Sequence, residues 1–134
     1  MKLLWAAGLI ALCTAPAWAH HSFAAEYDSS KVVTVKGTVT KLAWVNPHAY
    51  VYVDVKDENG KVTSWAFESL SPNALARQGW TRNSLKAGDQ VTVEAYMAKD
   101  GSPLADGSIH ANARLITMDG KKIFSGSSYD GQTK

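Results

Sequence analysis

The stretch VVTVKGTVTKLAWV, residues 32–45, decides the fold, because it has the pattern of one long and bent β-strand. In its first half, valines alternate with polar residues, which is typical of a strand with one buried face. From Leu42 to Trp44 the apolar side chains have changed to the opposite parity. One extra residue near Gly37 or Lys41 would return both halves to a common face, which is what a β-bulge does. A long, bent first strand is expected in a small closed barrel.

Four further segments have strand character, and one short helix is expected among them. The helix should occupy residues 73–78, with Ser71 as its cap, Pro72 in its first turn and Gly79 at its end. The strands are expected at residues 49–55, 62–68, 91–97 and 109–118, with a short extension at 121–124. Three strands, a helix and two strands predict an all-β fold, a five-stranded OB-like Greek-key barrel. An open β-sandwich of similar strand count is the alternative.

The first residues have the pattern of a secretory leader. An apolar run from Leu3 to Leu12 is followed by Ala17-Trp18-Ala19, a small-x-small cleavage site. Cleavage after Ala19 would make His20 the first residue of the mature protein. We therefore expect a signal peptide over residues 1–19, a barrel domain over 20–124 and a flexible tail over 125–134, in a periplasmic or secreted protein.

Composition excludes several classes of function. A net charge of +2 is far from the strongly basic balance that nucleic-acid binding requires. No second long apolar segment follows the leader, so no membrane span is expected after cleavage. The chain lacks a nucleophile elbow, a phosphate-binding glycine loop and a His-Glu-x-x-His motif. These absences favour a binding protein over an enzyme.

The chain resembles a family of small secreted bacterial proteins of unknown function. The segments that carry this resemblance span nearly the whole expected mature chain: HHSFAAEYD at 20–28, KGTV at 36–39, WVNPH at 44–48, WAFE at 65–68, SPNAL at 71–75, GW at 79–80 and GDQVTV at 88–93. The resemblance implies no activity. Its motifs single out His20, His21, His48 and Glu68, whereas the pattern around His110 is looser.

A histidine at the start of a mature chain points to metal binding. Its free α-amine and its imidazole can chelate one ion, and an all-nitrogen ligand set favours Cu(II). This arrangement resembles the start of a histidine brace, the copper site of lytic polysaccharide monooxygenases and of some periplasmic copper carriers. A brace needs a further histidine that the fold brings near, either His48 or His110. We expect copper as the cofactor, with His20, His21 and His48 as its ligands, in a protein for carriage, buffering or sensing; an oxidative copper enzyme is the least favoured variant.

Each of these residues also has a plainer interpretation. The two leading histidines can be a solvated start of the chain that Phe23 fastens to the barrel. His48 can be a turn residue that caps its strand through the backbone. Glu68 can orient a ligand histidine, although a solvated carboxylate at the strand end, or a partner of Arg77, is the favoured expectation.

Tyr50 and Tyr52 support a second hypothesis. They should share one face of the second strand, and OB folds bind saccharides and oligonucleotides by stacking on this part of the barrel. A metal-free adaptor in the cell envelope, which would grip a protein or a saccharide there, is therefore the alternative function. The three tryptophans Trp44, Trp65 and Trp80 are expected to pack in the core or at its rim.

Overall fold

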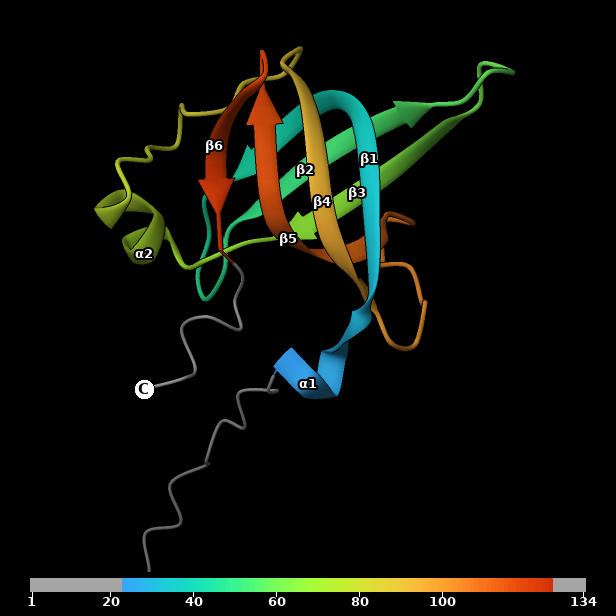
Figure 1. Cartoon of the computed structure of the whole chain (residues 1–134), viewed down its shortest axis with the longest axis horizontal. Coiled ribbons are helices and arrows are strands. Elements are labelled where there is room, and N and C mark those ends of the chain that lie inside the picture. The colour runs from blue at the N-terminus through green and yellow to red at the C-terminus, as the bar shows by residue number, and fades with distance from the viewer. Residues whose placement is uncertain (1–22, 127–134) are drawn as a thin grey trace, which may run out of the picture.

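The computed structural model describes residues 23–126 and shows a β-barrel with two short helices (Figure 1). Among these residues, no helix is long and apolar enough to cross a membrane. The expected leader, His20 and His21 lie outside the described residues, as does most of the expected tail. The elements in chain order are α1 (Phe23–Glu26), β1 (Tyr27–Ala43), β2 (Tyr50–Lys56), β3 (Val62–Glu68), α2 (Pro72–Arg77), β4 (Gln90–Ala98), β5 (Ile109–Met118) and β6 (Lys121–Ser125).

Five of the strands close into a barrel, which confirms the predicted fold. The sheet order is β3-β2-β1-β4-β5-β6, and an additional pairing joins β3 to β5. That closing pair is parallel and runs from Trp65 opposite Ile109 to Glu68 opposite Asn112. The other pairs are antiparallel. This is the arrangement of an OB-like Greek-key barrel, to which β6 adds a short edge.

Strand β1 bends as its sequence predicts. Its register against β2 shifts between Val39 and Lys41, close to where the change of parity requires an extra residue. The strand begins at Tyr27, five residues before the expected start at Val32, and a second register shift against β4 separates Asp28 from Val32. The early start matters because it brings Tyr27 into a small buried cluster with Phe23 and Ala98, apart from the main core.

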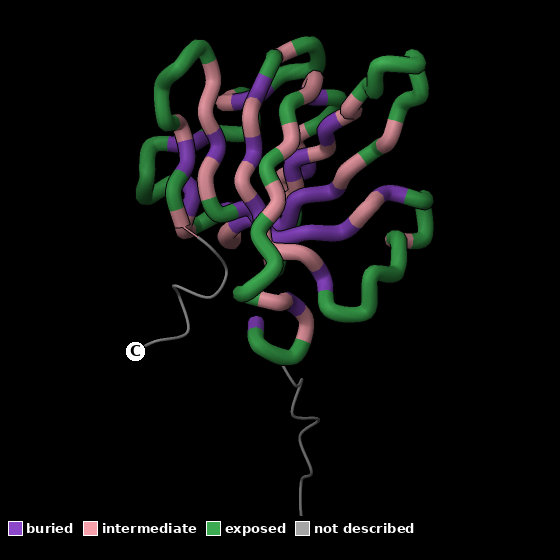
Figure 2. Tube along the Cα trace, turned by 45° about the vertical axis from the view of Figure 1, so that its right-hand side comes forward, coloured by how far each residue is buried: buried purple, intermediate pink, exposed green. Residues whose placement is uncertain are grey.

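The core lies inside the barrel, and α2 covers part of it. Buried residues alternate with half-buried and exposed ones along the strands (Figure 2). The side chain of Ser71 accepts a hydrogen bond from the Ala74 amide, so the predicted cap of α2 is confirmed. Trp80 packs back as expected: its indole N–H donates to the Ile123 carbonyl at 3.0 Å, and its ring lies edge-on to Phe124.

Helix α1 was not expected, and it is fastened below the barrel in the view of Figure 1. The Phe23 ring is only 5% exposed and lies 5.4 Å from the ring of Tyr27 and 5.3 Å from that of Tyr96. The backbone amide of Lys99 donates to the Glu26 carbonyl at 2.9 Å, and the Lys99 ammonium donates to the carbonyl of Ala24. The described chain therefore starts at a fixed place beside the barrel.

Candidate functional site

A buried carboxylate, Glu68, is the centre of the polar cluster in this barrel. Glu68 is the last residue of β3 and is only 4% exposed. It lies opposite Tyr50 of β2 and opposite Asn112 of β5, so a neighbouring strand flanks it on each side. The favoured expectation of a solvated carboxylate or a partner of Arg77 was wrong, because the parallel pairing with β5 encloses this strand end.

Four polar side chains from separate parts of the chain converge on the Glu68 carboxylate. His48 Nδ1 lies 2.7 Å from Oε1. On Oε2, the Tyr27 hydroxyl donates a hydrogen bond, the Tyr50 hydroxyl donates one at 3.3 Å, and His110 Nε2 lies 3.5 Å away. A carboxylate oxygen offers about two lone-pair sites, so Oε2 is fully occupied by its two tyrosine donors.

The cluster shifts the pKa values of its members in directions that follow from these contacts. Burial alone would raise the pKa of Glu68, but hydrogen bonds from His110, His48 and Tyr27 outweigh burial and hold the pKa well below its usual range. Burial, together with the Glu68 charge, raises the pKa values of Tyr27 and Tyr50. The hydrogen bond to Glu68 raises the pKa of His48, and burial only partly opposes this.

His48 lies just before β2 and is held by the side chain of Glu68. Its own side chain is 30% exposed, and its Nδ1 is bonded to Glu68. Backbone bonds join the Ala49 amide to the Leu70 carbonyl, and the Ser69 amide to the Ala49 carbonyl. The strand entrance is thus secured without His48, in contrast to the capping interpretation. Because Nδ1 faces Glu68, Nε2 is the nitrogen that can accept a metal ion.

His110, the second residue of β5, occupies the most enclosed position among the described histidines. Its side chain is 9% exposed, and its Nε2 lies 2.6 Å from the Tyr27 hydroxyl oxygen. Its Nδ1 points to a carboxylate oxygen of Glu26 in α1, at 4.0 Å. One ligand atom each from Glu26, Glu68 and His110 lies within 4.8 Å of the others. Sequence reasoning missed Glu26 and Tyr27 as members of the site, although both belong to the HHSFAAEYD segment.

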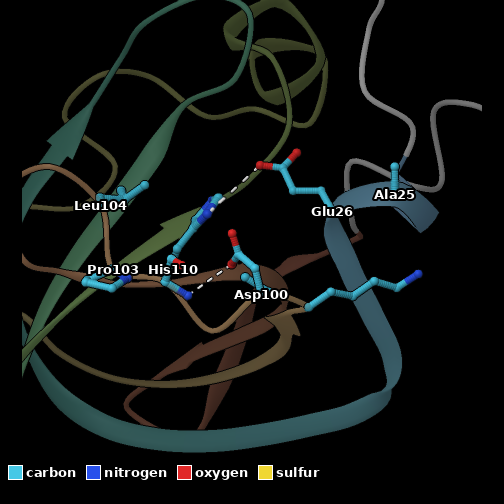
Figure 3. Close-up of a pocket in the computed structure, with 9 residues that line it drawn as sticks. Ala25, Glu26, Asp100, Pro103, Leu104 and His110 are labelled. Atoms are coloured by element: carbon cyan, nitrogen blue, oxygen red, sulfur yellow. Dashed lines mark hydrogen bonds and ion pairs between the residues drawn. The ribbon is translucent and has the colours of Figure 1, made fainter.

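A pocket of about 350 Å³ opens beside His110. It lies between α1 and the chain that leaves β4, and Figure 3 shows the His110 and Glu26 side chains facing each other in it. Ala25, Ala98, Pro103 and Leu104 give it apolar walls, and Asp100 adds a second carboxylate. The pocket therefore connects the inner cluster with solvent at the place where the described chain begins.

Tyr50 and Tyr52 do share a face, as their spacing predicts. Their ring centroids are 6.3 Å apart. The Tyr50 hydroxyl is bonded to Glu68, whereas Tyr52 has the Lys41 ammonium 5.8 Å from its ring centroid. Only Tyr52 is therefore separate from the Glu68 cluster, and a ligand-binding role for the pair stays a prediction.

Comparison with known proteins assigns the chain to a family without a described activity. No curated protein matches it in sequence. A family model described as a family of unknown function, DUF6152, matches residues 8–107. Because this match covers well over half of the sequence, the chain belongs to the DUF6152 family of unknown function.

Proposed function

We propose that this protein is exported to the cell envelope and binds a copper ion at the barrel end where His48 and His110 meet Glu68. The leading His20 would supply its α-amine and imidazole once the leader is removed, with His21 beside it. One observation carries the proposal: a single buried carboxylate contacts one nitrogen of each of two histidines. This is how carboxylates orient metal-binding imidazoles in known metal sites.

The anchored start of the described chain supports a contribution from His20. Phe23 is buried against the Tyr27 and Tyr96 rings, and α1 brings Glu26 to His110. His20 precedes Phe23 by three residues, which span at most about 11 Å when extended. A chelating residue on so short a tether has a high effective concentration at the barrel end.

The charges of the site also suit a cation. The ionised Glu68 lies inside the cluster, and the carboxylates of Glu26 and Asp100 line the pocket together with one cationic residue, Lys99. The Lys99 ammonium donates to the Ala24 carbonyl. Imidazole and amine nitrogens favour Cu(II) over the other common divalent ions. A site of this kind suits carriage, buffering or sensing of copper.

Titration of the processed protein with Cu(II) tests the proposal. The sample must begin at His20, and its control carries an acetylated α-amine on His20, which removes the amine chelate but keeps both imidazoles. The ligand-field absorption band and tryptophan emission measure Cu(II) binding. We expect binding to be at least tenfold tighter for the sample with the authentic start. Equal affinities for the two samples would refute the chelate.

The metal-free adaptor is the second candidate, and the Tyr50–Tyr52 ring pair favours it. Tyr52→Ala is the cleaner variant, because the Tyr50 hydroxyl belongs to the Glu68 cluster. If the protein is a saccharide-binding adaptor, Tyr52→Ala should abolish binding to envelope polysaccharide while acetylation of the His20 amine changes nothing. Retained binding in Tyr52→Ala would refute the adaptor.

A further inference from the structure

The hydrogen bonds around Glu68 determine which nitrogen of His110 carries a proton. The Tyr27 hydroxyl has one proton and contacts both the Glu68 carboxylate and His110 Nε2. If that proton pointed at His110, the Tyr27 and Glu68 oxygens would be in contact as two acceptors with no hydrogen between them. Tyr27 must therefore donate to Glu68, and its oxygen accepts from His110, so Nε2 bears the hydrogen.

The same assignment leaves a lone pair on Nδ1, the His110 nitrogen that faces Glu26. In a neutral imidazole with a proton on Nε2, Nδ1 is an acceptor. That Nδ1 faces the Glu26 carboxylate at 4.0 Å, which is too long for a direct hydrogen bond. Two acceptors that face each other across a pocket favour a cation between them. Metal bonds of about 2.0–2.2 Å from each side would span this gap.

Glu68 is near enough to be a ligand, but its oxygens are already in use. Tyr27 and Tyr50 donate to Oε2 and His48 donates to Oε1, and each of these donors is itself placed by a strand or a strand entrance. Binding of an ion by Oε2, the oxygen that lies 3.5 Å from His110 Nε2, would release at least one of its two tyrosine donors, at a cost of about 1–3 kcal/mol. Oε2 of Glu68 therefore suits the orientation of ligands better than ligation.

We propose that His110 Nδ1 and Glu26 are the ligands that the barrel contributes to the metal ion, and that Glu68 is a positioning residue that sets the His110 tautomer through Tyr27. This inference rests on the proposed function, and it adds His110 and Glu26 to the ligands expected from sequence. The ion lies in the pocket of Figure 3, between α1 and β5. The His110 side chain, nine-tenths buried, holds its Nδ1 toward this space.

Nitrogen-15 NMR of the metal-free wild-type protein tests the tautomer without any substitution. We expect a protonated signal for Nε2 of His110 and the downfield signal of an unprotonated nitrogen for Nδ1 at pH 7.5. A proton on Nδ1, whether in the other tautomer or in a doubly protonated ring paired with Glu26, would overturn the assignment.

Two substitutions test the ligands, with Cu(II) alone as the probe and the authentic His20 start in every sample. His110→Gln keeps a polar group near Tyr27 and removes Nδ1, while Glu26→Gln removes the carboxylate charge. Each should weaken Cu(II) binding at least tenfold, and electron paramagnetic resonance should show one coordinated nitrogen fewer in His110→Gln. Glu58→Gln, in the exposed β2–β3 turn, is the matched control and should bind as the wild type does.

The two proposals fail in different ways. If acetylation of the His20 amine weakens binding but His110→Gln and Glu26→Gln do not, the ligand assignment is wrong and the proposed function stands. If His110→Gln weakens binding but acetylation does not, the barrel site is correct and the chelate by His20 is wrong. Absence of specific Cu(II) binding by the wild type would overturn both.

Discussion

Glu68→Gln should destabilise the metal-free barrel far more than its small change in shape suggests. The glutamine has nearly the same size, but it replaces a charged acceptor with a neutral oxygen and a donor amide. If the amide group replaces Oε1, the part-exposed His48 loses its acceptor, and if it replaces Oε2, the buried Tyr27 loses its acceptor.

The magnitude follows from the contacts that change. Hydrogen bonds to a charged group contribute about 1.5–3 kcal/mol each, and removal of one partner of a buried ion pair costs about 3–5 kcal/mol. Because the glutamine oxygen keeps part of the network, we expect a loss of about 3 kcal/mol in the free energy of unfolding. A domain of this size has roughly 5–15 kcal/mol in total.

Urea unfolding at pH 7, followed by tryptophan fluorescence, measures this loss. The melting temperature should fall by roughly 12 °C or more, at about 4 °C or more for each kcal/mol. Glu58→Gln makes the same chemical change at an exposed turn and should stay within about 0.5 kcal/mol of the wild type. A loss below about 1 kcal/mol for Glu68→Gln would refute the view that Glu68 organises the cluster.

Three further predictions concern the backbone and the pH dependence of the barrel. Gly37→Ala should cost about 3 kcal/mol in urea unfolding, because a Cβ there would lie 2.8 Å from a valine methyl of β2 and would also meet a carbonyl oxygen of that strand. At Gly101, where φ is +64° and an added Cβ would meet open space, substitution by alanine should cost about 1 kcal/mol. Similar losses for Gly37→Ala and Gly101→Ala would contradict the close approach of Gly37 to β2. In proton NMR, His48 should titrate above the usual histidine pKa of about 6.5. Its stabilising contribution is therefore complete below about pH 6.5 and is lost as pH rises through the raised pKa. Glu68→Gln should return the His48 pKa to its usual value, and a wild-type midpoint at or below about 6.5 would count against the hydrogen bond between His48 and Glu68. Tyr27 should keep its proton beyond pH 10, so stability should fall above that pH because Tyr27 ionises only in the unfolded chain. Ultraviolet difference spectra against Tyr27→Phe measure this, and ionisation of Tyr27 near pH 10 in the folded protein would contradict its burial.

The elements that sequence predicted correctly are those with local causes. The change of parity between Val39 and Leu42 predicted the bend in β1, and the register shift lies there. Ser71 and Pro72 predicted the start of α2, because capping depends on residues three positions apart. Period-two alternation located each barrel strand to within a few residues, apart from the early start of β1.

The site itself depends on contacts between residues far apart in the chain. Glu68 is 41 residues from Tyr27 in the sequence, and His110 is 83 from the same tyrosine. The burial of Glu68 follows from the parallel pairing of β3 with β5, for which no local pattern exists. In the sequence, Glu68 stands at the end of its strand and on the parity opposite to Trp65 and Phe67, and both features suggested a solvated position. His48 could be selected from its motif, but its bond to Glu68 could not.

Anomalous X-ray scattering at the copper edge, from crystals of the processed protein loaded with Cu(II), tests the central claim most directly. We predict one strong peak in the pocket beside α1, bonded to His110 Nδ1 and Glu26, with the amine and imidazole of His20 among its further ligands. A peak elsewhere on the surface, or no peak at the barrel end at full copper loading, would contradict the account.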